Sequence, residues 1–389
     1  MLTLLVLPGG AHAAPTDAVR DQQWALRMLN ATEAWRTTKG KGITVAVLDT
    51  GVDGDHPDLR GSVLKGRDLV GLGAQRGSDS WARHGTAMAG TIAGHGHGKG
   101  RKEGLLGIAP QARVLPVRVL LEDDDPSRPQ ARRKHRNTVA EGIRWAADHG
   151  ADVINLSLGD DSGGARPAPA EDAAVRYALG KGVSVVASAG NGGNKGDHTS
   201  YPAAYPGVIA VAAVDRRSAR ASFSTRRWYT TVSAPGKDVA IPRAGGGYFE
   251  GWGTSLAAAY TSGVVALVRA AHPDLSPAQV KKLLADTARR TPAGGRSDSL
   301  GTGVVDPSAA IELGSQVKPQ PQKPSSPRYE KEHFGPGPRR DESFWPAVWT
   351  GALGVALIVG AVALHRGVGN LPGLRTRLPR TVPVRETRW

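Results

Sequence analysis

The sequence predicts an α/β fold in which helices flank a doubly wound, mostly parallel β-sheet. One observation is a set of short Val-, Ile- and Ala-rich runs without alternating polar residues, a pattern that indicates strands buried on both faces. A second is that helical stretches separate these runs, which is the chain order of a doubly wound sheet. The predicted strands are 43–48, 114–120, 153–158, 183–188 and 208–214, and the helices between them are 86–93, 138–149 and 170–181.

Length and composition agree with a large enzyme-sized domain. The chain has 389 residues, enough for one α/β domain with appended segments. Its 51 glycines and Ala-rich helices favour a tightly packed interior. The absence of cysteine excludes disulfides, thiolate metal sites and a cysteine nucleophile.

The net charge of +15 is unevenly distributed. Residues 315–389 carry twelve Lys or Arg against five Asp or Glu, so almost half of the excess lies outside the globular part. The remaining charge has no interleaved aromatic residues, and nucleic-acid binding is therefore not predicted. A basic secreted enzyme working near anionic cell-surface polymers fits this pattern better.

The N-terminus resembles an export signal followed by a short extension. Residues 1–14 are predicted to form a signal peptide, because an apolar run precedes small residues around Ala13 and Ala14. No basic residue precedes that run, which indicates a truncated signal peptide; a frayed apolar terminus is the alternative. Residues 15–40 form an N-terminal extension, and we hypothesise that Trp24 and Trp35 pin it to the domain.

The globular domain is predicted to span 41–314. Its last amphipathic helix begins after Ser276, which is placed as N-cap, with Pro277 at the first helical position. We expect this helix to continue to about residue 290. Pro, Gln, Lys and Ser then dominate 315–343, a composition typical of an extended linker.

The C-terminal region predicts a membrane anchor. Residues 344–364 contain no charge and are long enough to cross a bilayer as a helix. Trp345 and Trp349 are placed as interfacial anchors, and 365–389 is a basic tail. An excess of positive charge on the cytoplasmic side predicts that this tail is cytoplasmic and the domain extracellular. A buried core helix is the alternative interpretation.

Three polar residues stand at the ends of predicted elements. Ser255 begins a small-residue helix that continues to about residue 271, where backbone N–H groups and the helix dipole favour negative charge. Asp49 closes the first strand, and His84 opens a second small-residue helix. A serine nucleophile, a histidine base and an aspartate that orients the base are the groups needed for acyl transfer.

The strings around these residues resemble the motifs of the subtilisin family of serine proteases. The aspartate motif is Asp-Thr-Gly at 49–51, continued to residue 59, and the histidine motif is His-Gly-Thr at 84–86. The serine motif is Gly-Thr-Ser at 253–255. The resemblance implies a subtilisin-like fold for 41–314, with Ser255 as nucleophile, His84 as general base and Asp49 as its partner.

Further roles follow from the same resemblance. Asn191 lies in a Gly-Asn-Gly turn and resembles the family's oxyanion-hole asparagine, whereas in isolation it would be interpreted as a turn residue. The family also implies a strand that pairs with extended peptide and a primary pocket with a small polar floor. These substrate-binding residues are Ser157, Leu158, Gly159, Ser188, Ala189, Gly190 and, at the floor, Ser200.

No metal or other cofactor is predicted. The segment 94–100 lacks the Asn-rich loop that binds calcium in secreted relatives, and Asp58 alone is a poor ligand set. His95 and His97 could bind a metal, but a solvated Gly-rich loop is the favoured interpretation. The charged stretch 122–136 is interpreted as a solvated surface loop, with a processing site or a dock for an acidic partner as alternatives.

The overall architecture resembles the mycosins, membrane-anchored subtilisin-like proteases of type VII secretion in actinobacteria. Only about 35 residues separate Ala14 from Asp49, too few for the folded inhibitory prodomain of many relatives. The resemblance implies polypeptide substrates and a type VII secretion membrane complex as partner. Two functions remain open: an anchored endopeptidase acting on exported proteins, or a stabiliser of the secretion complex whose protease activity is incidental. A nutrient-scavenging protease is disfavoured by the anchor.

Overall fold

The computed structural model describes residues 18–78, 80–134, 137–322, 354 and 357–363. The chain divides into two units, Met1–Gly335 and Pro336–Trp389. The first contains the α/β domain, and the second has a helical segment at 357–363. The predicted signal peptide, most of the linker, most of the span 344–364 and the basic tail lie outside the described residues, so these assignments stay predictions.

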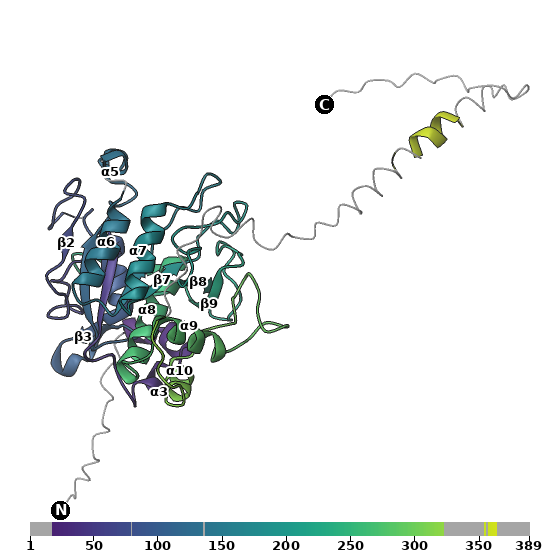
Figure 1. Ribbon diagram of the computed structural model, residues 1–389. Helices are drawn as coiled ribbons and strands as arrows, with labels where there is room; N and C mark the ends of the chain where they lie inside the picture. Colours follow the sequence, from purple (N-terminus) through teal and green to yellow (C-terminus); the bar gives the residue numbers. More distant parts are fainter. Residues whose placement is uncertain (1–17, 79, 135–136, 323–353, 355–356, 364–389) are drawn as a thin grey trace, which may run out of the picture. The chain divides into compact units, whose positions relative to one another are not determined.

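A seven-stranded sheet in the order β2-β5-β1-β6-β7-β8-β9 forms the centre of the first unit, and every neighbouring pair is parallel (Figure 1). Side chains alternate between its two faces: Val45 and Val47 belong to one hydrophobic core, and Ala46 and Leu48 to the other. The strands are β1 (Thr44–Asp49), β2 (Arg67–Asp68), β5 (Arg113–Arg118), β6 (Val153–Leu156), β7 (Ser184–Ser188), β8 (Ile209–Val214) and β9 (Thr230–Pro235).

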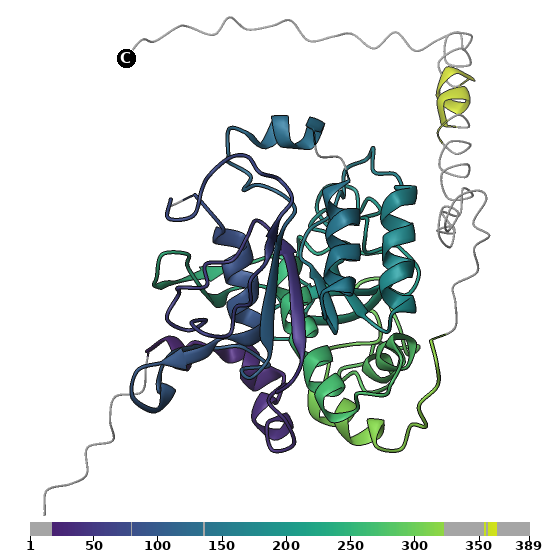
Figure 2. The ribbon, with the colours of Figure 1, turned by 60° about the vertical axis from the view of Figure 1, so that its left-hand side comes forward.

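Helices cover both faces of the sheet. On one face α6 (Thr138–Asp148) and α7 (Pro169–Gly180) lie side by side, as Figures 1 and 2 show. On the other face α4 (Arg83–Ala93) packs beside α8 (Thr254–Ala271). Three further helices are α5 (Arg128–Lys134), α9 (Pro277–Asp286) and α10 (Pro307–Gly314). Two hairpins pair β3 (His95–His97) with β4 (Glu103–Leu106), and β10 (Val239–Pro242) with β11 (Tyr248–Gly251).

The five predicted strands are present as β1, β5, β6, β7 and β8, but several other assignments were wrong. Strand β9 was missed because its Thr and Ser residues, although buried, interrupt the apolar run. The segment 94–100 is not simply a solvated loop, since it contains β3. The stretch 122–136 is not simply a surface loop either, because Glu122 and Asp125 are buried and α5 forms within it. Helix α9 ends at Asp286, earlier than predicted.

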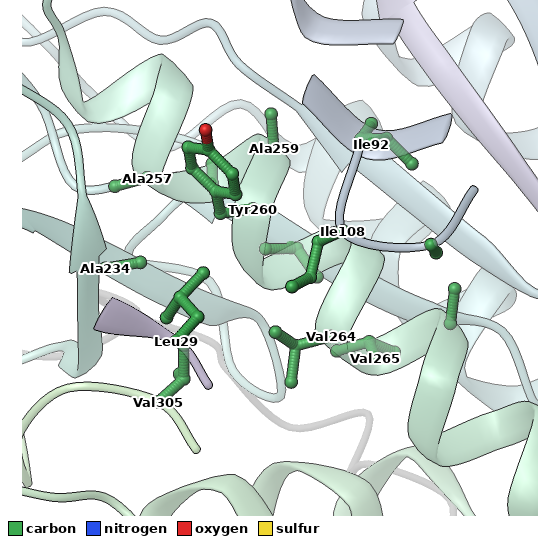
Figure 3. Close-up of a cluster of buried hydrophobic side chains, with 14 of the residues drawn as sticks. Leu29, Ile92, Ile108, Ala234, Ala257, Ala259, Tyr260, Val264, Val265 and Val305 are labelled. Atoms are coloured by element: carbon green, nitrogen blue, oxygen red, sulfur yellow. The ribbon is translucent and has the colours of Figure 1, made fainter. Parts of the chain in front are cut away.

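Helix α8 is the centre of the larger hydrophobic core. Fourteen of its eighteen residues are buried. Figure 3 shows Val264 of α8 next to Ile108 and near Leu29, and all three belong to the same hydrophobic core. Gly263 permits this close packing, because a Cβ atom at this position would lie 1.9 Å from the Ile108 Cγ2 atom.

The same helix is the one described helix with the length and apolar character to cross a membrane. However, 78% of its apolar window is buried inside the domain, as expected for a core helix. The small residues of α8 allow close packing in the core, and they are not evidence that this helix spans a membrane.

The N-terminal extension is an integral part of the domain. It forms three short helices, α1 (Ala18–Asp21), α2 (Trp24–Met28) and α3 (Ala31–Ala34). The Trp24 indole N–H donates to the Asp238 carbonyl at 2.7 Å, and the Trp35 indole N–H donates to the Ile108 carbonyl at 2.8 Å. Both tryptophans therefore fix the extension through packing and a hydrogen bond.

We expect Trp24→Ala to destabilise the domain by about 3 kcal/mol, because Trp24 is only 6% exposed and truncation leaves a cavity. Differential scanning calorimetry should show a melting temperature lower by roughly 5–10 °C. Trp24→Phe keeps most of the ring packing but loses the hydrogen bond, so it should lower the free energy of unfolding by only about 1 kcal/mol. Phe249→Ala is the matched exposed control, and equal melting curves for all variants would contradict the anchoring role.

Candidate active site

The predicted catalytic residues meet at the carboxyl edge of the sheet. Asp49 is the last residue of β1, and Asn191 lies in the turn after β7. His84 and Ser255 are each the second residue of a helix, α4 and α8 respectively. In open parallel sheets this edge is where ligands bind, because loops and helix N-termini converge there.

Asp49 and His84 form a short, partly buried ion-pair contact, with Asp49 inside the domain and the His84 ring facing the cleft. The His84 Nδ1 atom lies 2.8 Å from the Asp49 Oδ1 atom and 2.9 Å from Oδ2. The Asp49 carboxylate also accepts the Thr50 backbone N–H at 2.7 Å. Helix α4 can approach β1 this closely because Gly85 has no side chain: a Cβ there would lie 1.9 Å from the Gly51 carbonyl oxygen.

The environment of His84 favours the charged imidazole. Burial disfavours that form, but the charge of Asp49 and the hydrogen bond to it outweigh burial, and Glu122 and Asp123 add to their effect. Together they raise the pKa of His84 to about 9. The neutral imidazole that can accept a proton therefore becomes populated as the pH rises through this value. Because the pKa of His84 is higher in the folded state, the Asp49–His84 pair stabilises the fold fully at a pH below the ordinary histidine pKa of 6.5. This stabilisation is lost as the pH rises from 6.5 through about 9.

Ser255 is held against the strand end at Ser157. The Ser255 hydroxyl donates to the Ser157 carbonyl at 3.1 Å, and the Ser157 hydroxyl donates to the Ser255 carbonyl at 2.8 Å. Ser255 and His84 line the same cleft. To donate to His84, the Ser255 hydroxyl would have to rotate away from Ser157. Catalytic hydrogen bonds are often long or poorly aligned in unliganded enzymes.

Asn191 is oriented by the residue before the nucleophile. Its side-chain oxygen accepts from the Thr254 backbone N–H at 3.0 Å and from the Thr254 hydroxyl at 2.9 Å. A Cβ atom on Gly253 would lie 3.9 Å from both the Asn191 Nδ2 atom and the Ser255 Cβ atom. The Asn191 amide nitrogen and the Ser255 side chain therefore both border Gly253, and both residues line the cleft. An amide N–H in such a cleft is a suitable donor to an oxyanion.

A cleft of about 1290 Å³ joins most of the predicted site residues. Asp49 and Ala189 do not line it, and both are fully buried behind its wall. The hydroxyl of Ser200 is also fully buried, and within the described part of the chain it has no hydrogen-bond partner. The predicted residues that do line the cleft are His84, Ser157, Leu158, Gly159, Ser188, Gly190, Asn191, Ser200 and Ser255.

Sequence reasoning missed Glu122, which lines the same cleft. Its carboxylate accepts the backbone N–H of His84 at 3.0 Å, and the residue is 9% exposed. It therefore holds the first turn of α4 as well as raising the His84 pKa. The acidic run 122–125 gave no signal for this role, because a local charge cluster is usually solvated.

The residues at the expected calcium position do not fit a calcium ion. The buried Asp58 carboxylate accepts from His97 Nδ1 at 2.6 Å, from the Leu105 N–H at 2.9 Å and from the Tyr248 hydroxyl at 2.8 Å. Nearby, the Arg20 guanidinium donates to three carbonyl groups of the β3–β4 hairpin, those of residues 101, 103 and 104. Calcium needs six to eight oxygen ligands, and the chain's own donors already use these oxygens.

His95 offers no metal site either. One ring nitrogen lies 2.7 Å from the Gly96 carbonyl oxygen and the other 3.1 Å from the Arg60 carbonyl oxygen. Among the described residues, no group of three or more His, Asp or Glu side chains is arranged to hold a metal ion. The alternative interpretation of His95 and His97 as metal ligands is therefore not supported.

Comparison with known proteins identifies the family. The subtilase family profile matches residues 40–303, more than half of the chain. The chain therefore belongs to the subtilase family, and the predicted resemblance to subtilisin-like serine proteases is confirmed. Fervidolysin from Fervidobacterium pennivorans is 37% identical over 323 residues, which cover 76% of this chain but only 44% of fervidolysin.

Solved structures share the fold over a similar range. MycP1 from Mycobacterium smegmatis is 29% identical with a TM-score of 0.65, and the alignment covers 82% of this chain and 91% of MycP1. The MycP3 protease from the type VII (ESX-3) secretion system is 33% identical with a TM-score of 0.61, covering 79% of this chain and 90% of MycP3. The predicted similarity to mycosins is thus confirmed.

We expect Glu122→Gln to lower the pKa of His84, because the substitution removes a nearby negative charge that stabilises the imidazolium. An NMR titration of the ¹⁵N-labelled imidazole should place the wild-type midpoint near pH 9 and the variant midpoint lower. Glu312→Gln removes the same charge from an exposed position on α10 and serves as control. An unchanged midpoint in Glu122→Gln would contradict this role.

Proposed function

We propose that the chain is a serine endopeptidase, held at the cell membrane by residues 344–364, that cleaves exported or secretion-system proteins. The observation that carries the proposal is the convergence of the Asp49–His84 pair, Ser255 and Asn191 at one cleft. These groups supply a base, a nucleophile and an oxyanion donor, which together suffice for acyl transfer.

In the proposed mechanism, the Ser255 Oγ atom attacks the carbonyl carbon of the scissile bond while His84 takes its proton. Asp49 stabilises the resulting imidazolium, and Asn191 donates to the oxyanion. Collapse of the intermediate breaks the C–N bond, and His84 gives its proton to the leaving amine. Water then attacks the acyl-enzyme by the same route and restores Ser255.

For the substrate, we propose that an extended peptide pairs with 157–159. The side chain of the residue that precedes the scissile bond would then enter the pocket between 157–159 and 188–190. The Ser188 hydroxyl donates to the Leu158 carbonyl at 3.3 Å, so the two walls of this pocket are linked. The buried hydroxyl of Ser200 forms a small polar floor. This arrangement favours a moderate-sized residue before the cleaved bond.

The alternative function is structural. A solved relative, MycP1, is described as an essential component of the type VII (ESX-1) secretion system. By analogy, this chain would stabilise a membrane secretion complex, with peptide hydrolysis incidental. Complementation in the source organism separates the two functions: if Ser255→Ala restores secretion to a deletion strain, the structural role dominates, and if it does not, hydrolysis is required.

We expect Ser255→Ala to abolish peptide hydrolysis and labelling by a sulfonyl fluoride, because both need the nucleophilic oxygen. Asn191→Ala should keep labelling competence but lower kcat by about 10²–10³, the range typical for loss of one oxyanion-hole donor in a subtilisin. Steady-state kinetics on a casein-derived peptide and intact-mass spectrometry measure these effects. Hydrolysis by a folded Ser255→Ala variant would refute the proposal.

We further propose that the domain needs no calcium, because the Arg20 guanidinium supplies a positive charge at this position and the Asp58 carboxylate is already hydrogen-bonded to the His97 ring and the Tyr248 hydroxyl. A chelator should leave the melting temperature unchanged. Arg20→Met should lower it by several degrees, because three carbonyl groups lose a charged donor. Arg36→Met, on the exposed end of the extension, is the control. A fall in melting temperature of the wild-type protein with chelator would overturn the proposal.

A further inference from the structure

A second pocket, separate from the catalytic cleft, is lined mainly by arginine. It has a volume of about 350 Å³ and shares no lining residue with the cleft. Among the described residues, none that lines it is acidic. Aromatic and apolar side chains complete its walls. The lining residues are Trp24, Arg27, Met28, Arg216, Arg289, Arg290 and Val304.

The four arginines of this pocket come from three separate segments. Arg27 is on α2 in the N-terminal extension, and Arg216 follows the end of β8. Arg289 and Arg290 follow α9. A run of arginines on one helix would be interpreted as a solvated face. Arginines that only tertiary packing brings around one hollow are not explained in that way, because each of the three segments could have carried another residue there.

Two of these guanidinium groups are held in place by the domain. The Arg289 Nε atom donates to the Asp306 carboxylate at 2.8 Å, and its Nη2 atom donates to the Met28 carbonyl. The Arg216 guanidinium carbon lies 5.6 Å from the centroid of the Trp24 ring, a distance at which a cation and an aromatic face attract each other. The pocket therefore has fixed walls that link the extension to the rest of the domain.

Three guanidinium groups remain available to a ligand. Within the described part of the chain, the exposed side chains of Arg27 and Arg290 have no hydrogen bond or ion pair. The ion pair of Arg216 with Glu250 is long, at 4.0 Å, and both side chains are more than half exposed, so it contributes little. Arg290 also has a φ of 56°, in the left-handed region that side chains of this size rarely adopt. Such backbone strain is found most often at binding sites.

The chemistry of the lining residues defines the ligand. Guanidinium groups match carboxylates and phosphates, because their planar N–H donors can bind two oxygens at once. The ring of Trp24 and the side chains of Met28 and Val304 give the same pocket apolar walls. A phosphate ion has nothing to place against such walls, whereas a peptide with both acidic and apolar side chains uses all of them. The volume is near the lower end of the range for ligand pockets, about 300–1,000 Å³, and suits a few side chains.

We propose that this pocket docks a short segment of a partner protein in which acidic and apolar residues alternate. Carboxylates of the segment bind Arg27, Arg216 and Arg290, and its apolar side chains contact Trp24 and Met28. Four like charges around one hollow repel one another, and a bound acidic segment relieves that repulsion. The inference goes beyond the proposed peptidase function and does not depend on it, because no residue of the proposed triad lines the pocket.

Fluorescence anisotropy with a labelled hexapeptide of alternating glutamate and leucine tests the docking. The full-length protein carries Ser255→Ala, so that the peptide is not hydrolysed and failure of the peptidase proposal leaves the result unchanged. Arg27→Gln combined with Arg290→Gln should weaken binding about tenfold, because two charged donors are lost. The matched control, Lys65→Gln combined with Arg67→Gln, removes two exposed charges at β2, the edge strand opposite β9, and should keep the wild-type affinity.

Competing ligands test the chemistry of the pocket. A peptide of alternating glutamine and leucine should not bind, and one of alternating glutamate and serine should bind more weakly than the glutamate–leucine peptide. Equal affinity of the two glutamate peptides overturns the proposal, because the apolar walls would then have no role. Displacement of the labelled peptide by inorganic triphosphate at a lower concentration than by unlabelled peptide also overturns it, in favour of a phosphate-bearing ligand.

The variants distinguish docking from general charge attraction. Equal weakening in the two double variants overturns the proposal, because it means that any positive charge on the surface serves as well. Melting curves establish that each variant is folded. Should the pocket double variant fail to fold, Arg27→Gln alone is compared with Arg67→Gln alone, and equal affinity in these two variants overturns the assignment.

Discussion

A single buried charge organises the site. The Asp49 carboxylate is 0% exposed at the end of the central strand β1, and such a charge is costly unless it is fully paired. The Thr50 N–H and the His84 ring provide that pairing. The need to satisfy Asp49 therefore fixes the imidazole, and with it the first turn of α4, in the position required of a general base.

The first turns of α4 and α8 line the same cleft. Thr254 orients Asn191, and Ser157 holds Ser255, so the proposed nucleophile and oxyanion donor are linked to two neighbouring strand ends. Glu122 also fixes the first turn of α4, because its carboxylate accepts the His84 backbone N–H. Small residues make these approaches possible, since a side chain at Gly85 would separate α4 from β1.

Residues 18–34 of the N-terminal extension pack against the domain. Within the described residues 18–34, none lines the cleft, and Arg20, Trp24 and the neighbouring Gln23 all bond to the domain. Arg20 supplies a cation to carbonyl groups of the β3–β4 hairpin. These contacts make residues 18–34 part of the folded domain.

The sequence by itself determined the parallel sheet and predicted the three residues of the proposed triad, because buried strands require uninterrupted apolar runs and the motifs around Asp49, His84 and Ser255 are local strings. It failed for β9, whose buried Thr and Ser residues have no local signature, and for Glu122, whose partner lies 38 positions away. The hydrogen bonds of Arg20 were equally hidden. Only the tertiary structure decided them, because their partners come together through packing of segments far apart in the chain.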